Sequence, residues 1–380
     1  MRLLFLIMIF IVPYALGDVQ PKWELNDVSY LFSLPASFSK DSLLKLSSKG
    51  KYGDLLSRAY FDALPPITLD LTPDQTYQQL RVVGIRIDPC FAGPSSGQCQ
   101  PQVRLVWQPL VERSTGATLT TDDAAIHTFY NIPTNEFNDL LNDLQKLKRE
   151  NTFSSQGLPL GVHPGLNNDD KNVTFIKALE EVFLARIGFA RVSRVTFMQL
   201  SGAGNIWNFG GFNVCGGKLV RLLIPRIMSQ TQTFVNNPFP ENTYFDHAYA
   251  SPEPKGNDTF NLIIHDSRLI APSDEPNIKL AAVSMSRIEN PKFHTSESVD
   301  CVSCHLAQPA RTWTVRQFPW LHLQMNEFIY RSEFNLTNVS PSQENTTIIR
   351  GFGYFERQPA ISQRAINESA EIADQLNKVH

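Results

Sequence analysis

Apolar and polar residues alternate along two stretches in the first third of the chain. Apolar side chains occupy every second position over 83–87 and again over 103–107, and a segment rich in Gly, Pro and Ser lies between them. A period of two on both sides of a turn-forming segment is typical of two antiparallel strands. We therefore predict a β-hairpin over about residues 78–112.

Elsewhere the apolar residues recur every three or four positions, as on the buried face of an amphipathic helix. Phe137, Leu140 and Leu144 follow this pattern shortly after Pro133, a residue that suits the start of a helix. The predicted helices span about residues 135–149, 173–187, 275–288 and 361–377, and further strands span about 190–200, 217–225, 260–265 and 346–356.

The order of these elements predicts an α+β fold. Helices and strands do not alternate regularly, so a doubly wound parallel sheet is not expected and antiparallel pairing is favoured. We expect a scaffold with an antiparallel sheet and helices, followed by a mainly helical C-terminal segment. The glycines within 202–217 are interpreted as turns between strands of this sheet.

The first seventeen residues predict export. A short positive start is followed by the apolar stretch Leu3–Val12, by Pro13 and by small residues up to Gly17. This is the pattern of a secretory signal peptide over residues 1–17, and its apolar stretch is too short to cross a bilayer. No later stretch reaches the roughly eighteen apolar residues of a membrane-spanning helix. We therefore expect an exported protein without a transmembrane anchor.

Composition narrows the class of protein without naming a function. Apolar residues make up 42% of the chain and charged residues 19%, which are values typical of a globular protein. The net charge is −3 and the basic residues are dispersed, so nucleic-acid binding is not expected. The densest basic run, at 146–149, ends a predicted helix, where positive charge complements the helix dipole.

For three of the five cysteines we predict a structural role and not a part in binding or catalysis. Cys90 and Cys99 lie at the two ends of the hairpin turn, and in an oxidising compartment we expect them to form a disulfide. Cys215 is interpreted as a buried free thiol, with an intermolecular disulfide or a reactive thiol as alternatives.

The other two cysteines lie in the run Cys301-Val302-Ser303-Cys304-His305. Two thiols about one helical turn apart can both reach the vinyl groups of one haem, and the histidine that follows can ligate the iron. Covalent haem attachment in bacteria takes place outside the cytoplasm, which agrees with the predicted signal peptide.

This run resembles the haem-attachment signature of the c-type cytochromes. The resemblance covers about a tenth of the chain, and the long N-terminal part does not look like a small cytochrome c fold. The resemblance implies one covalently bound haem c. It implies that Cys301 and Cys304 form the thioether bonds and that His305 is the proximal ligand of the iron.

The length of the chain suggests a division into parts. We expect the signal peptide at 1–17, an α+β scaffold with the disulfide hairpin over 18–270, and a haem-bearing region over 271–380.

Two other interpretations of the paired thiols are less favoured. A zinc site needs a second pair of ligands at similar spacing, and none is found in the sequence. A redox-active disulfide needs a lowered thiol pKa, whereas the negative charge of Asp300 would raise that pKa.

The second axial ligand of the iron stays open at this point. His294 precedes the motif, and His322 and Met325 follow it on a predicted helix. A methionine would raise the reduction potential, a histidine would lower it, and an open position would admit a small ligand. Arg311 and Arg316 are candidate partners of the haem propionates, because guanidinium groups suit carboxylates.

The sequence therefore predicts an exported monohaem cytochrome of the c type in the periplasm or cell envelope of a bacterium. Its expected activity is one-electron transfer through iron, with a redox partner protein as donor or acceptor. The long haem-free part leaves two alternatives open. One is a peroxidase-like haem oxidoreductase with an open distal site, and the other is an envelope binding or sensing protein in which the haem is structural.

Overall fold

A computed structural model describes most of the chain. The predicted signal peptide and the tip of the predicted hairpin lie outside the described residues. The described residues are 21–35, 42–68, 70–92, 99–112, 119–121, 124–151, 153–167, 170–201, 206–235, 245, 249–251, 258–340 and 348–379.

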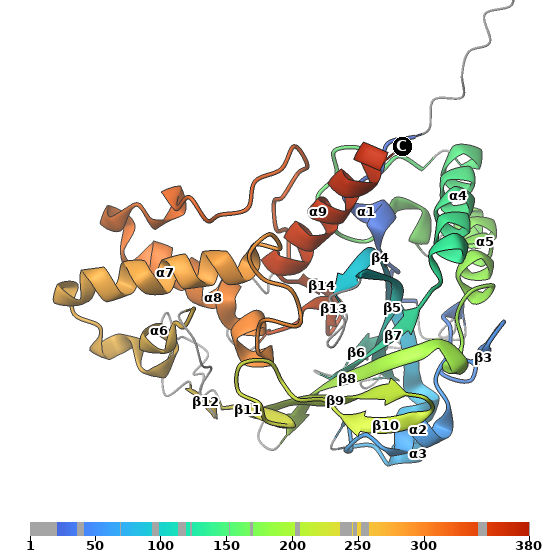
Figure 1. Cartoon of the computed structure of the whole chain (residues 1–380), viewed down its shortest axis with the longest axis horizontal. Coiled ribbons are helices and arrows are strands. Elements are labelled where there is room, and N and C mark those ends of the chain that lie inside the picture. Colours follow the sequence, from blue (N-terminus) through green and yellow to red (C-terminus); the bar gives the residue numbers. More distant parts are fainter. Residues whose placement is uncertain are drawn as a thin grey trace, which may run out of the picture.

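One antiparallel sheet forms the centre of the described structure (Figure 1). Its main path has the order β1 (Ser29–Leu31), β4 (Leu80–Ala92), β5 (Cys99–Glu112), β7 (Ala125–Asn131), β8 (Val192–Ser201), β9 (Ile206–Cys215), β11 (Thr231–Val235) and β12 (Tyr249–Ser251). Two short strands join its margins, since β6 (Leu119–Thr121) pairs with β5 and β10 (Lys218–Arg221) pairs with β9. The predicted α+β class with antiparallel pairing is confirmed.

Strands β4 and β5 form the predicted hairpin. They pair along most of their length, with two register shifts in β4. Such β-bulges bend a strand and increase its twist. The backbone of Cys90 lies in β4 and that of Cys99 begins β5. Their side chains lie outside the described part of the structure, so the disulfide stays a prediction.

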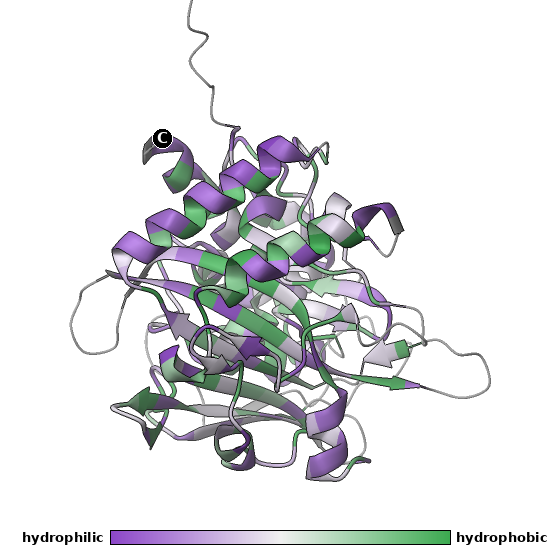
Figure 2. Cartoon of the chain, turned by 90° about the vertical axis from the view of Figure 1, so that its right-hand side faces the viewer, coloured by the Kyte–Doolittle hydropathy of each residue, from purple (hydrophilic) through white to green (hydrophobic). Residues whose placement is uncertain are grey.

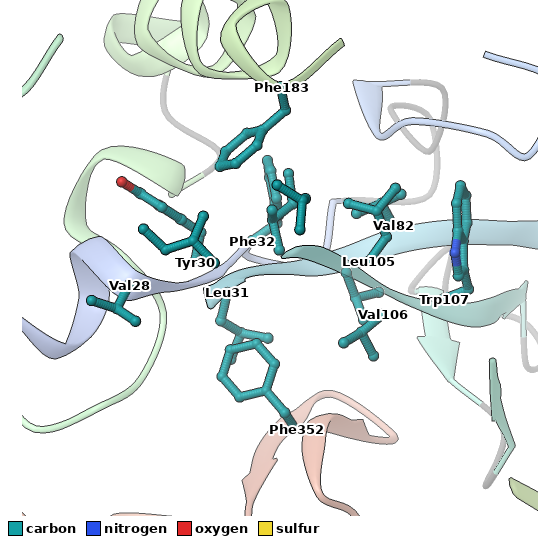
Figure 3. Close-up of a cluster of buried hydrophobic side chains, with 14 of the residues drawn as sticks. Val28, Tyr30, Leu31, Phe32, Val82, Leu105, Val106, Trp107, Phe183 and Phe352 are labelled. Carbon is teal, nitrogen blue, oxygen red and sulfur yellow. The ribbon is translucent and has the colours of Figure 1, made fainter. Parts of the chain in front are cut away.

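The two faces of the sheet carry different apolar residues, because consecutive side chains of a strand point to opposite faces. In Figure 3, Trp107 and Val82 lie on the side of Phe183, whereas Val106 lies on the side of Phe352. Helices α4 (Thr134–Glu150) and α5 (Val173–Leu184) pack on the first face. Helices on this side change between purple and green along their length in Figure 2, as expected when one stripe of a helix is buried.

Long helices dominate the C-terminal part of the described chain. They are α7 (Glu275–Glu289), α8 (Cys301–Gln317) and α9 (Gln363–Val379), and the hairpin of β13 (Phe352–Phe355) and β14 (Gln358–Ile361) precedes α9. The predicted inner stripe of α9 is buried, and it consists of Ala365, Ile366, Ala370, Ala373 and Leu376. The mainly helical C-terminal segment is therefore confirmed.

The predicted strand at 260–265 is wrong, because this segment forms a short helix. The amides of Ile263 and Ile264 donate to the carbonyl oxygen of Phe260, and a short apolar run does not by itself distinguish a strand from a buried helical turn. The remaining short elements are α1 (Leu25–Val28), β2 (Lys49–Gly50), β3 (Gly53–Asp54), α2 (Arg58–Asp62), α3 (Pro73–Gln79) and α6 (Asn261–His265).

Strand β9 contains glycines that the sequence analysis assigned to turns. A Cβ atom on Gly211 would lie 2.3 Å from the carbonyl oxygen of Val195 on β8, so this close approach of two strands requires glycine. The glycines at 216–217 do form a turn, with φ angles of 58° and 77°. Cys215, which ends β9, is an exposed free thiol, so its predicted burial is wrong.

Residues from both sides of position 270 share apolar cores. One core contains Trp23 and Phe183 together with Phe352 and Ile366. The backbone of Trp23 also exchanges hydrogen bonds of 2.8 Å and 3.0 Å with the side-chain amide of Asn377 on α9. A second core joins β8, β9 and β11 to α7 and α8. The division of the chain into domains at residue 270 stays a prediction.

A buried amide connects β13 to the central sheet and provides a test of this packing. The side chain of Gln108 donates to the carbonyl oxygen of Tyr354 at 2.9 Å and accepts from its amide at 2.7 Å. Gln108→Leu would leave the backbone N–H of Tyr354 without its acceptor. We therefore expect a loss of about 1–3 kcal/mol in the free energy of unfolding, measured by urea denaturation. Replacing the exposed Gln78 of α3 by Ala is the matched control. A loss no larger than that of the control would contradict the assignment.

Candidate functional site

The Cys-x-x-Cys-His run forms the first turn of α8. Asp300 is the N-cap, and its carboxylate accepts from the amide of Ser303 at 2.9 Å. Gln232 of β11 donates to the same carboxylate at 2.8 Å and accepts from the amide of Val302 at 3.0 Å. Both Gln232 and Asp300 are fully buried. The sheet therefore fixes the position at which α8 begins.

The three motif side chains share one face of α8, because positions three and four apart are neighbours on a helix. Cys301, Cys304 and His305 are partly exposed, whereas Val302 and Leu306 are buried in the second core. The partly exposed face is directed into a cavity.

This cavity lies between the second face of the sheet and the helices α8 and α9. The volume of the cavity is about 200 Å³, and part of the cavity is continuous with solvent. The motif forms part of one wall, and β4, β5, β7, β8 and β9 contribute to the opposite wall. Apolar residues of the lining include Val106, Phe129, Met198, Phe209 and Phe352.

The orientation of His305 suits an axial ligand of a metal. Its Nδ1 atom is hydrogen-bonded to the carbonyl oxygen of Ile349, and since a carbonyl oxygen only accepts, Nδ1 carries the proton. The lone pair of the neutral ring is therefore on Nε2. A backbone carbonyl that holds Nδ1–H is a common support of metal-binding histidines. Burial lowers the pKa of His305, against the effect of this hydrogen bond, and so favours the neutral form that binds a metal.

The two thiols do not have the character of a redox-active pair. Burial is the main cause that raises the pKa of Cys301 well above its usual range, and Asp300 adds to it. Burial likewise raises the pKa of Cys304 to about 11. Reactive dithiols have a lowered pKa, so the raised pKa values of Cys301 and Cys304 do not favour a redox-active pair. Both cysteines are free in the structure, with no disulfide between them.

Positive charge is in excess in the described lining of the cavity. Five arginines face three acidic residues: Arg86, Arg104, Arg194, Arg350 and Arg364 against Glu297, Asp300 and Glu368. Asp88, outside the lining, pairs with Arg104 at 2.6 Å. A wall of this kind suits a ligand that carries carboxylates.

Glu368 of α9 is the central carboxylate of this charged wall. It pairs with Arg364 at 2.7 Å and with Arg86 of β4 at 3.2 Å. Burial alone would raise the pKa of Glu368, but the two arginines outweigh it and hold the pKa at about 2. The ion pair between Arg86 of β4 and Glu368 of α9 thus connects the sheet to the helix on the other side of the cavity.

The sequence analysis missed His127, which lies in β7 and lines the same cavity. Its neighbours across the sheet are Val106 on β5 and Thr196 on β8, which line the cavity too. Burial is the main cause that lowers the pKa of His127 to about 3, and His305 and Arg86 add to it. The ring is therefore neutral. The sequence analysis predicted no strand around His127, and a single histidine without a motif does not indicate which face or cavity it lines.

His294 and His322, two of the candidate distal ligands, lie outside the cavity lining. The Nε2 atom of His294 is 2.6 Å from a carboxylate oxygen of Asp258, and its Nδ1 atom is 3.1 Å from the hydroxyl of Ser298. His322 is exposed, with a left-handed backbone at φ 52°. Neither belongs to the lining of the cavity. Met325 has a described backbone, but its side chain lies outside the described part of the structure.

The two arginines after the motif are also separate from the cavity lining. Arg311 pairs with the buried Glu289 of α7 at 2.6 Å. Arg316 lies near the end of α8, several turns from the motif. The arginines that do line the cavity come from the sheet, from residue 350 and from α9.

No protein-family model, curated protein or solved structure matches the chain. In the described part of the chain, no helix has the length and apolar character needed to cross a membrane. The same part contains no group of three or more His, Cys, Asp or Glu side chains that is arranged to hold a metal ion. A haem differs from a bare ion in this respect, because the protein supplies only axial ligands to its iron.

The charged wall predicts a dependence of stability on pH. The pKa of Glu368 is about 2 in the folded chain against 4.5 as its ordinary value, so its stabilising effect is present above about pH 4.5 and is lost as the pH falls towards 2. Glu368→Gln would leave buried arginines without their carboxylate, and we expect a loss of about 3–5 kcal/mol in the free energy of unfolding at pH 7.

Urea denaturation at pH 7 and at pH 3 measures both effects. The variant should lose less stability than the wild type on acidification, because the titrating group is absent. Glu333→Gln is the control, since the side chain of Glu333 is 89% exposed. Equal losses in the two variants at pH 7 would contradict the role assigned to Glu368.

Proposed function

We propose that the chain is an exported monohaem c-type cytochrome-like protein that transfers single electrons. The observation that carries this proposal is the position of Cys301, Cys304 and His305 on one helical face directed into a partly apolar cavity. Two thiols and one imidazole with a free Nε2 form the donor set that covalent attachment of a haem requires.

Each motif residue then has a distinct role. Cys301 and Cys304 form thioether bonds as their thiols add across the two vinyl groups. His305 binds the iron through Nε2, while the carbonyl of Ile349 fixes its ring. Phe209 supports the ring from the sheet, with the two ring centres 5.0 Å apart.

The positive wall supports the same assignment. A haem carries two propionate carboxylates, and guanidinium groups bind carboxylates through paired hydrogen bonds. Arg86, Arg104, Arg194, Arg350 and Arg364 line the cavity. The proposed propionate partners are therefore among these arginines, in place of Arg311 and Arg316, the partners expected from the sequence.

Electron transfer is the activity that best suits this arrangement. The haem supplies a one-electron couple, and the protein sets its potential through axial ligation, burial and charge. Burial lowers the pKa of both histidines in the cavity, which favours the neutral form that binds a metal. One haem carries one electron at a time, so the proposal includes a redox partner protein. Export to the periplasm or envelope follows from the predicted signal peptide.

Replacement of each motif cysteine tests covalent attachment. The full chain is produced in a bacterial host with haem-attachment machinery, and intact mass and pyridine haemochrome spectra are measured. We expect the wild type to carry one haem with two thioether bonds. Cys301→Ala and Cys304→Ala should each leave one unreacted vinyl group, which shifts the haemochrome band to longer wavelength, and the double variant should lose covalent haem entirely.

Cys215→Ser is the matched control, because Cys215 is exposed and outside the cavity lining. It should retain the wild-type mass and spectrum. A wild-type protein with the mass of the bare polypeptide, or a double variant that still carries covalent haem, would contradict the proposal.

A further inference from the structure

His127 offers the cavity a second imidazole, from the wall opposite the haem-attachment motif. We infer that His127 is the second axial ligand of the haem iron, opposite His305. This inference rests on the proposed function, because it presupposes a haem attached at Cys301 and Cys304. It adds a ligand from the middle of the sheet, about 170 residues before the motif.

The register of the sheet determines where His127 lies. His127 is opposite Val106 on β5 and opposite Thr196 on β8. Residues directly opposite each other in antiparallel strands have their side chains on the same face, and all three line the cavity. The motif of α8 lines it from the helical side. The two imidazoles therefore enter one cavity from its two walls.

His127 is partly exposed, and its hydrogen bonding differs from that of the buried histidines. His294 is held by Asp258 and Ser298, and the Nδ1 atom of His163 accepts from the amide of Gly165 at 3.0 Å. The ring of His127 has no hydrogen bond to another described residue. An imidazole that lines a cavity and has no hydrogen bond to a described residue can bind a ligand there through a ring nitrogen.

Met198 is the competing ligand, since it lines the cavity on β8. It lies opposite Ala125 and Phe209 in the sheet and is buried in the second core with Trp207 and Phe234. This apolar surrounding explains Met198 as a packing residue.

Two histidine ligands would have a definite consequence. They would give a six-coordinate, low-spin iron and a lower reduction potential than a histidine–methionine pair. Such a site favours electron transfer over the binding of a small ligand, because no coordination position is free.

Spectroscopy of the haem-loaded full chain tests the inference. We expect the ferric wild type to be low-spin in its optical and electron paramagnetic resonance spectra. His127→Ala should lose the low-spin signal and become high-spin, and added imidazole should restore it. Met198→Leu, the matched control, should keep the wild-type spectrum. His127→Gln, which retains more of the side-chain volume, replaces the alanine variant if that variant does not fold.

The outcomes separate this inference from the proposed function. If the wild type carries covalent haem but the His127 variants keep its low-spin spectrum, or if the wild type is itself high-spin, the inference is overturned and the attachment site stands. Loss of the low-spin signal in Met198→Leu but not in His127→Ala would assign the ligand to methionine. A wild type without covalent haem would overturn both proposals.

Discussion

The position of α8 on the sheet is the constraint on which the candidate site depends. Gln232 of β11 binds both the N-cap carboxylate of Asp300 and the amide of Val302. A glutamine amide has a donor and an acceptor, so one side chain fixes both the place and the direction of the first helical turn. Cys301, Cys304 and His305 all belong to that turn. The two hydrogen bonds of Gln232 therefore help to set the direction in which the three side chains enter the cavity.

The same cavity brings together charges that would be costly to bury alone. Arg364 of α9 donates to backbone carbonyls of Ile288 and His294 and pairs with Glu368. Glu368 in turn pairs with Arg86 of β4. This chain of contacts connects α9 to the turn before the motif and to the sheet. Buried ion pairs add little net stability, but they define the spacing of the walls between which the proposed haem would lie.

Local hydrophobic patterns predicted most of the long helices and strands. The residues that the sequence did not predict depend on contacts between segments far apart in the chain. The hairpin of β4 and β5 and the helix α9 have clear periods in the sequence, and the attachment motif is contiguous. Strand β7 is buried at most positions on both faces, so it shows no alternation that would identify it. His127 and the cavity arginines come from distant segments, which the register of the sheet and the packing of α9 bring together. Gly211 also depends on a tertiary contact, its close approach to Val195.

The most direct test of the account is diffraction at the iron absorption edge from crystals of the mature chain produced with haem-attachment machinery. The account predicts one anomalous iron peak in the cavity between the sheet and α8, bonded to Nε2 of His305, with continuous density from the porphyrin to the sulfurs of Cys301 and Cys304. Crystals with no iron peak in this cavity, or with a disulfide between the two cysteines, would contradict it.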